Sequence, residues 1–241
     1  MKKYRHLFFD LDGTLWDLQR NTRAAMEIMF GEFTLPAEKF DAFFHRYHYH
    51  NDKVWALYRD GKMDKETLRT IRFERAMADT GLQDVSVLEF ADRFLEVCPA
   101  QPHLIEGSLE LLDHCAGRYG MHIITNGFVE VQGIKMRAAG LDGYFEHIIF
   151  SEDAGVRKPH RGIFELAMQK AGASPEESLM IGDDWDADIL GARDFKMDQA
   201  FLTSTEAMLA AMGEAHAERP VRHNYHPTYT LQSLLELKSI L

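Results

Sequence analysis

The stretch Leu7-Phe8-Phe9-Asp10-Leu11-Asp12-Gly13-Thr14 decides the fold of this chain, because it joins an apolar run to a pair of acids. Residues 7–9 are continuously apolar, which is typical of a strand covered on both faces of a parallel sheet. Gly13 permits a sharp backbone turn just after that strand. Two carboxylates at such a strand end, Asp10 and Asp12, can share one pocket, where one attacks a substrate and the other handles a proton. An Asx-type turn without chemistry is the alternative interpretation of Asp-Gly.

An apolar run that ends in polar residues recurs along the chain. Residues 121–124 lead into Thr125-Asn126-Gly127, residues 147–150 into Ser151, and residues 178–181 into Gly182-Asp183, while residues 199–202 predict a further strand. Segments of helical length lie between them, at residues 108–118, 131–139, 162–171 and 188–194. This alternation predicts an α/β fold with a parallel sheet, in which ligands bind at the carboxyl ends of the strands. Residues 227–241 predict a strand-to-helix closure of the same core.

Residues 18–100 break the alternation, because they show helical periodicity and no clear buried strand. We therefore expect a helical insert at residues 18–100 within an α/β core formed by residues 1–17 and 101–241. Asp60-Gly61-Lys62 and Thr80-Gly81 are its expected turns. The insert is rich in aromatic residues at helical spacing, which favours a packed core over substrate ligands. They include Phe44, Tyr47, Trp55 and Tyr58.

Composition limits the classes of protein to consider. The chain has 241 residues, 46% of them hydrophobic and 27% charged, as in a soluble globular protein. Its formal net charge of −11 argues against a nucleic-acid polymer as partner. The sequence contains no signal peptide and no apolar run of the roughly 20 residues that span a bilayer, so we expect no membrane association and a cytoplasmic location. Cys98 and Cys115 are expected to be buried free thiols.

A second acidic cluster follows residues 178–181. Asp183, Asp184, Asp186 and Asp188 could simply cap a helix and favour its dipole. If several of these acids met those near Asp10, they would repel and raise one another's pKa unless a hard cation held them, and oxygen ligands select Mg²⁺. Lys158 and Thr125 would add a cation and a hydroxyl, which with backbone N–H groups suit a transferring phosphoryl group.

These elements, in this order, resemble the haloacid dehalogenase-like (HAD) phosphohydrolases. The stretch from Asp10 to Thr14 resembles the first motif of that family, Thr125 the second, Lys158 the third, and Gly182-Asp183 with Asp188 the fourth. The resemblance covers nearly the whole chain. It implies a Rossmannoid parallel core and identifies the insert as a helical cap domain of the C1 type.

The resemblance also implies roles for individual residues. Asp10 would attack phosphorus and form an aspartyl-phosphate, and Asp12 would act as acid and then base, its pKa raised by neighbouring acids and by burial. Asp184 departs from the Ser or Thr often found there, so we rank it behind Asp183 and Asp188 as a metal ligand. The implied catalytic residues are Asp10, Asp12, Thr125 and Lys158, the phosphate-binding residues Asp10, Thr125, Asn126 and Lys158, and the Mg²⁺ ligands Asp10, the backbone carbonyl of Asp12, Asp183 and, in support, Asp188.

Several segments are similar to the bacterial pyrimidine 5′-nucleotidases, namely residues 11–16, 55–61, 123–128, 151–159 and 227–230. This similarity implies hydrolysis of nucleoside 5′-monophosphates by a monomer or homodimer. Haloacid dehalogenases lack the second acid, so Asp12 favours phosphate as the substrate. Two alternatives stay open: a phosphatase or phosphomutase of small metabolites such as phosphoglycolate or sugar phosphates, and a non-catalytic module that binds a phosphorylated ligand.

Overall fold

The computed structural model describes residues 3–82, 84–203 and 225–241. These residues form two compact units. The first contains residues 3–19, 102–203 and 225–241, and the second contains residues 20–82 and 84–101. Residues 204–224, which the sequence analysis placed in the core, lie outside the described residues.

The first unit is built on a six-stranded parallel sheet, which confirms the predicted α/β fold. Its strands are β1 (His6–Phe9), β2 (Gly120–Thr125), β3 (His147–Phe150), β4 (Ser178–Gly182), β5 (Asp198–Leu202) and β6 (Tyr229–Leu231). They lie in the order β3-β2-β1-β4-β5-β6. Strand β1 is therefore central, with Phe9 in register with Ile123 of β2 and Ile181 of β4. Asp10 consequently leaves the sheet between the carboxyl ends of β2 and β4.

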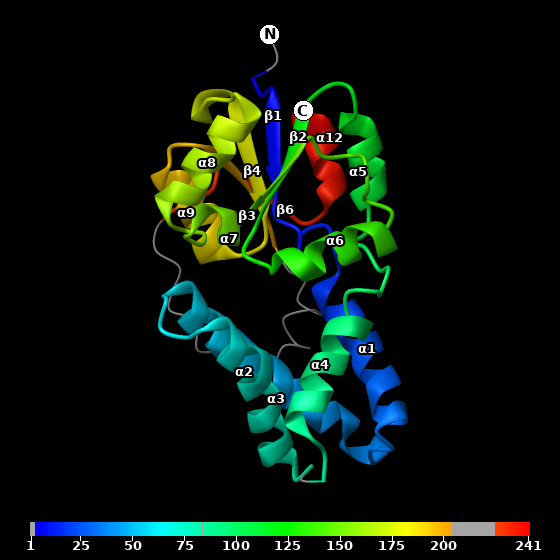
Figure 1. Cartoon of the computed structure of the whole chain (residues 1–241). Helices are drawn as coiled ribbons and strands as arrows, with labels where there is room; N and C mark the ends of the chain where they lie inside the picture. The colour runs from blue at the N-terminus through cyan, green and yellow to red at the C-terminus, as the bar shows by residue number, and fades with distance from the viewer. Residues whose placement is uncertain (1–2, 83, 204–224) are drawn as a thin grey trace. The chain divides into compact units, whose positions relative to one another are not determined.

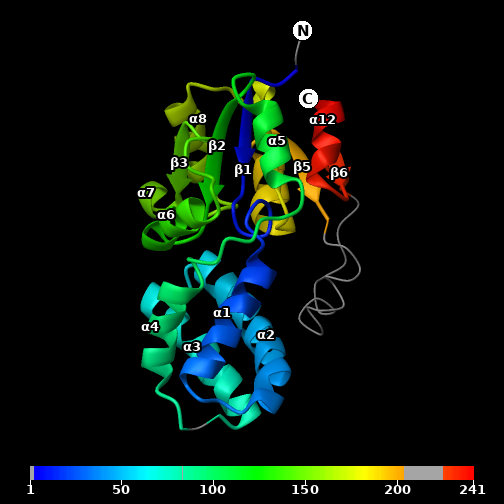
Figure 2. The ribbon, with the colours of Figure 1, turned by 90° about the vertical axis from the view of Figure 1, so that its right-hand side faces the viewer.

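Helices cover both faces of this sheet (Figures 1 and 2). The helical segments of the first unit are α5 (Ser108–Cys115), α6 (Val129–Ala138), α7 (Ser151–Ala154), α8 (Arg161–Ala171), η2 (Pro175–Glu177), η3 (Trp185–Leu190), α9 (Gly191–Asp194), η4 (Leu234–Glu236) and α12 (Leu237–Ile240). On one face, Phe164 of α8 and Phe195 after α9 pack with Phe8, Ile124 and Met180 of the strands. In Figure 1, α5 and α12 lie on the opposite side of the sheet. Burying each large apolar side chain contributes roughly 1.5–3 kcal/mol, so this double covering stabilises the sheet whose strand ends carry the polar residues.

The predicted helix at residues 188–194 begins earlier than expected. A π-helical turn, η3, starts at Trp185 and runs into α9. The cause is Asp184, whose side chain accepts hydrogen bonds from the backbone N–H groups of Asp186 and Ala187. Asp184 is therefore the N-cap, and it brings Asp188 into the first turns of the helix.

The second unit is helical and contains α1 from residue 20 onward. Its elements are α1 (Leu18–Glu32), η1 (Ala37–Lys39), α2 (Phe40–Arg59), α3 (Lys65–Thr80) and α4 (Val87–Val97). The two expected turns contain Gly61 and Gly81, with φ of 69° and 67°. The aromatic residues pack inside the unit: Phe44, Tyr47 and Tyr58 are buried, as predicted, whereas Trp55 is half-buried.

Two further expectations can be compared with the described residues. Cys98 and Cys115 are both buried and form no disulfide, which confirms the prediction of buried thiols outside disulfides. None of the helices in the described part of the chain is long and apolar enough to cross a membrane.

Candidate active site

The loop after β1 is held by its own backbone. The N–H of Asp10 donates to the carbonyl of Ile181 at 2.9 Å, which continues the pairing of β1 with β4 beyond the strand end. Gly13, with φ of 90°, donates to the carbonyl of Trp16 at 2.9 Å, and Trp16 donates back to Leu11 at 2.8 Å. Because Trp16 is fully buried, this loop is anchored to the core and fixes the positions of both acids.

Three carboxylates gather at the carboxyl edge of the sheet. Oxygen atoms of Asp10, Asp183 and Asp188 all lie within 4.8 Å of one another. The ammonium of Lys158 lies 2.6 Å from an oxygen of Asp10 and 2.6 Å from one of Asp188. Lys158 is only 2% exposed and Asp188 is fully buried, so solvent screens these charges weakly. The cluster thus carries three acids against one buried cation.

The crowding of acids changes their protonation. Burial raises the pKa of Asp10 to about 7, and nearby Asp188 and Asp12 add to this effect while Lys158 opposes it. Burial also raises the pKa of Asp183 well above its usual range, helped by Asp10 and Asp188. The pKa of Asp188 is raised by burial as well, against the pull of Lys158. Burial alone would lower the pKa of Lys158, but the two carboxylates outweigh it and raise that pKa. Without a further cation, the cluster therefore retains protons near neutral pH.

The donor set suits a hard divalent cation. The three acids offer only carboxylate oxygens, which are ligands that Mg²⁺ prefers. They offer no nitrogen or sulfur donor of the kind typical of zinc sites. Gly13 lets the Asp183 side chain approach the loop after β1 closely, because an added Cβ would lie 2.4 Å from an oxygen of Asp183. The hydroxyl of Thr14 donates to the other oxygen of Asp183 at 2.9 Å and orients this carboxylate. The described residues thus fit Mg²⁺ held by Asp10 and Asp183, with Asp188 close by.

Asp184 and Asp188 have different surroundings. Asp184 directs one oxygen at the N–H groups of η3, at 2.9 and 3.0 Å, and it is not part of the three-acid cluster. Asp188 binds Lys158 through one oxygen and accepts the N–H of Asp184 through the other, at 3.1 Å. This geometry favours a role for Asp188 in holding Lys158 and a structural role for Asp184.

Asp12 lies among hydrogen-bond donors. Its carboxylate accepts from the ammonium of Lys135 at 2.6 Å and from the amide of Gln132 at 2.8 Å. Both donors are buried, and the Lys135 ammonium also lies 4.4 Å from the centre of the Trp16 ring. The sequence led us to expect acids and burial around Asp12, and α6 adds a cation that was not expected. Gln132 and Lys135 were missed from the sequence, although their spacing of three residues on the helix after Thr125-Asn126-Gly127 puts them on one face.

Gln132 connects Asp12 to Thr125. Its amide nitrogen donates to the Thr125 hydroxyl oxygen at 2.7 Å, and that oxygen also accepts the N–H of Gly127 at 2.9 Å. A hydroxyl has two acceptor lone pairs and one donor hydrogen. With both lone pairs engaged, Thr125 can bind a further group only by donating its hydrogen. Gly127 permits this packing, since an added Cβ would lie 2.2 Å from the amide nitrogen of Gln132.

Asn126 positions Lys158. Its side chain donates to the Lys158 carbonyl at 3.0 Å and accepts the Lys158 N–H at 2.8 Å. The two loops that follow β2 and β3 are therefore tied together at the residue that carries the buried ammonium. Asn126, which the family resemblance implies as a phosphate-binding residue, thus also has this structural role through its side chain.

The predicted site residues thus lie in two hydrogen-bonded groups that meet at the loop after β1. Asp10 belongs to the group with Lys158, Asp183 after β4 and Asp188 of η3. Asp12 belongs to the group with Thr125, Gln132 and Lys135. The separation of the two acids gives each a distinct environment, one rich in negative charge and one rich in donors.

Two features together are typical of one class of hydrolase: a parallel sheet with acids at its carboxyl edge, and the order of these motifs along the chain. The sequence matches the haloacid dehalogenase-like hydrolase family over residues 4–196, and the chain belongs to that family. The predicted similarity to bacterial pyrimidine 5′-nucleotidases is also confirmed. The chain is 31% identical to pyrimidine 5′-nucleotidase YjjG of Escherichia coli, over 99% of this chain and 98% of that protein. It is 31% identical to pyrimidine 5′-nucleotidase PynA of Streptococcus pneumoniae, over 81% and 82% of the two chains.

Solved structures show the same architecture. The HAD-hydrolase YfnB of Bacillus subtilis superimposes with a TM-score of 0.83 at 26% identity, covering 100% of this chain and 99% of that one. The L-2-haloacid dehalogenase of Xanthobacter autotrophicus has a TM-score of 0.76 at 19% identity, covering 100% and 98%, which establishes a shared fold alone.

Proposed function

We propose that this chain is a Mg²⁺-dependent phosphomonoesterase that transfers the phosphoryl group of its substrate to Asp10. The observation that carries the proposal is the buried contact of Lys158 with Asp10 and Asp188 beside Asp183, at the edge of the sheet where α/β enzymes bind ligands. Among the relatives, glyceraldehyde 3-phosphate phosphatase of Methanothermobacter thermautotrophicus is 30% identical over 54% of this chain. The solved structure of YfnB is bound to magnesium.

The first half of the reaction uses Asp10 and Asp12. A carboxylate oxygen of Asp10 attacks phosphorus, the bond from phosphorus to the ester oxygen breaks, and the departing oxygen takes a proton from Asp12. Lys158 and the donor hydrogen of Thr125 stabilise the phosphoryl oxygens. A Mg²⁺ ion held by Asp10 and Asp183 would offset the negative charge that otherwise opposes an anionic substrate.

The second half releases phosphate. Water gives a proton to Asp12, attacks phosphorus and breaks the bond to Asp10, so inorganic phosphate leaves and both acids return to their initial states. Gln132 and Lys135 keep the Asp12 carboxyl group fixed during both transfers. A 1 Å misplacement of such a group can cost about a hundredfold in rate, which is why these buried donors matter.

For the substrate we propose a pyrimidine nucleoside 5′-monophosphate, hydrolysed in the cytoplasm. The support is the near-complete alignment with YjjG and the similarity to PynA, whose names state that activity. We further propose that the helical unit, expected as residues 18–100, acts as the cap over the core. Small-metabolite phosphates are the second candidate, because the match to glyceraldehyde 3-phosphate phosphatase covers half of this chain.

A panel of substrates tests the proposal. Phosphate release with Mg²⁺ would be measured for pyrimidine and purine nucleoside monophosphates, a hexose phosphate and phosphoglycolate, alongside a 2-haloacid. We expect turnover to be highest for pyrimidine nucleotides and absent in Asp10→Asn. Equal or greater turnover of the sugar or glycolate phosphates would move the assignment to the second candidate. Halide release from the haloacid, or tight phosphate-ester binding without turnover, would contradict the phosphatase mechanism itself.

A further inference from the structure

A cluster of histidines lies on the sheet away from the acidic site. His6 of β1, His122 of β2 and His147 of β3 stand on adjacent strands, with His122 in register with His147. The rings of His122 and His147 stack, with centroids 5.4 Å apart. Ligand atoms of His122, His147 and Glu146 all lie within 4.8 Å of one another. These residues take no part in the proposed phosphatase chemistry.

The His122 ring is buried, and one of its nitrogen atoms has no hydrogen-bond partner among the described residues. That atom is Nδ1, and the side chain is 0% exposed. A buried polar atom without a partner usually indicates a water or an ion that binds there.

The other nitrogen of His122 is already occupied. Its Nε2 atom lies 3.1 Å from Nδ1 of His6, within hydrogen-bond distance. In the tautomer that carries the proton on Nε2, His122 donates to His6 and offers the Nδ1 lone pair to a cation, which is the usual outer-shell arrangement of metal-bound histidine. The backbone accommodates this pair at Gly120, where an added Cβ would lie 2.8 Å from His6 Nδ1.

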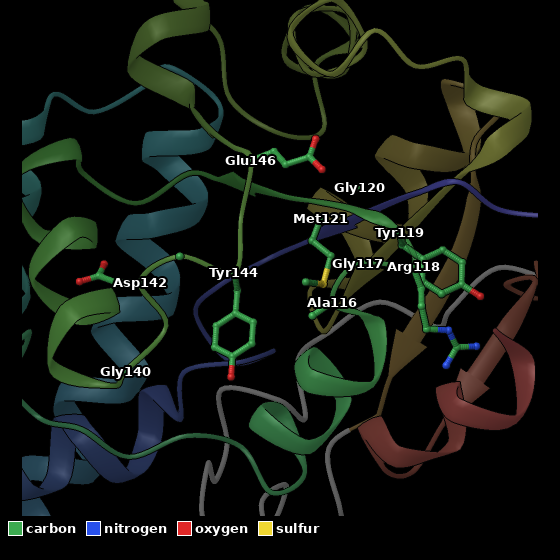
Figure 3. Close-up of a pocket in the computed structure, with 11 residues that line it drawn as sticks. Ala116, Gly117, Arg118, Tyr119, Gly120, Met121, Gly140, Asp142, Tyr144 and Glu146 are labelled. Atoms are coloured by element: carbon green, nitrogen blue, oxygen red, sulfur yellow. The ribbon is translucent and has the colours of Figure 1, made fainter.

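The remaining two residues provide access and charge. His147 is half-buried and Glu146 is exposed, so an ion could reach them from solvent. Glu146 borders a hollow of about 860 Å³ that Tyr119 and Tyr144 also line (Figure 3). Two imidazoles and one carboxylate match the ligands of Zn²⁺, whereas Mg²⁺ prefers oxygen donors.

We propose that His122, Glu146 and His147 form a binding site for a divalent transition-metal ion of the Zn²⁺ type, separate from the acidic site. The ion would join β2 to the start of β3, with His6 of β1 orienting one of its ligands.

Calorimetric titration with Zn²⁺ tests the site in metal-stripped protein supplied with excess Mg²⁺, which occupies the oxygen-rich cluster. We expect one Zn²⁺ per chain. Glu146→Gln and His147→Gln should each weaken binding at least about tenfold, because each removes one ligand from an ion that has few. Both side chains have solvent access, so these variants test the site without emptying the core as His122→Ala could. His45→Gln, in the helical unit, is the matched control and should bind as the unchanged protein does.

Three results would overturn the proposal. The first is the absence of Zn²⁺ binding in excess Mg²⁺, and the second is equal affinity in the unchanged protein, Glu146→Gln and His147→Gln. The third is loss of the Zn²⁺ signal in Asp183→Asn, since this would place the ion in the acidic cluster. Retention of the signal in Asp183→Asn, together with its loss in His147→Gln, supports a separate site irrespective of phosphatase activity.

Discussion

Replacing Lys158 with methionine tests the electrostatic basis of the site. The substitution keeps most of the apolar stem but removes an ammonium that is 2% exposed and lies 2.6 Å from both Asp10 and Asp188. Removing one partner of a buried ion pair typically costs about 3–5 kcal/mol, because the charge left behind stays desolvated. We expect a loss in that range in the free energy of unfolding of metal-free Lys158→Met at pH 8, where Asp10 is ionised in the unchanged protein.

Guanidinium unfolding in the presence of a chelator measures this loss. Lys170→Met is the matched control, because the Lys170 ammonium meets Asp153 at 3.3 Å with both side chains at least one-third exposed. Exposed pairs contribute about 0–1 kcal/mol, so the control should stay within that range. Adding Asp188→Asn to Lys158→Met removes one of the uncompensated charges and should restore part of the lost stability.

Activity provides a second readout of the same change. Lys158→Met should lower kcat about a hundredfold or more under saturating Mg²⁺, as expected when a cation that stabilises transferring oxygens is lost. Equal unfolding free energies for Lys158→Met and Lys170→Met, or no recovery in the double variant, would refute the view that Lys158 balances the acids.

Four further outcomes follow from the geometry. Asp10→Asn should abolish turnover and prevent labelling of the protein by a ³²P-phosphate ester, and any residual labelled protein would exclude Asp10 as the nucleophile. Lys135→Met should lower kcat by about 10- to 100-fold with little change in KM, because the fixed position of Asp12 is lost. An unchanged kcat would show that Lys135 only packs against Trp16. Since the folded pKa of Asp10 is raised to about 7, the metal-free protein should lose stability as pH rises from about 4 through 7, and Mg²⁺ affinity should fall about tenfold per pH unit below 7. Both trends are measurable by thermal unfolding with and without Mg²⁺, and a flat affinity between pH 5 and pH 7 would contradict the proton displacement. Gly13→Ala should weaken Mg²⁺ binding in the same assay, because its Cβ would lie 2.4 Å from an oxygen of Asp183.

The sequence predicted the core well because its signals are local. Each buried strand is a short apolar run that ends in polar residues, and parallel strands necessarily place those endings along one edge of the sheet. From that geometric rule, the sequence alone predicts that four side chains lie near one edge of the sheet, namely those of Asp10, Thr125, Lys158 and Asp183. The turns of the helical unit were equally local, since Gly61 and Gly81 adopt the positive φ angles that favour glycine.

The features that sequence reasoning missed depend on packing between elements. Lys135 and Gln132 lie on α6, whose sequence has no marked amphipathic pattern, and only the docking of this helix against the loop after β1 shows that they contact Asp12. The different roles of Asp184, which caps η3, and Asp188, which contacts Lys158, likewise depend on where η3 begins. A shift of the helix start by three residues changes which carboxylate caps the helix and which one reaches Lys158.

The acidic cluster also explains why a chain of net charge −11 can act on an anion. With Asp10, Asp183 and Asp188 ionised, Lys158 leaves the site formally with two negative charges in excess. At an effective dielectric constant of about 20, two unit charges 4 Å apart repel by about 4 kcal/mol, enough to reduce binding of an anion nearly a thousandfold for each pair of like unit charges. A second lysine would correct only half of that excess, whereas one divalent ion removes all of it. The three-to-one ratio of acids to cations therefore supports the proposal that the site accepts phosphate only after a divalent ion has bound.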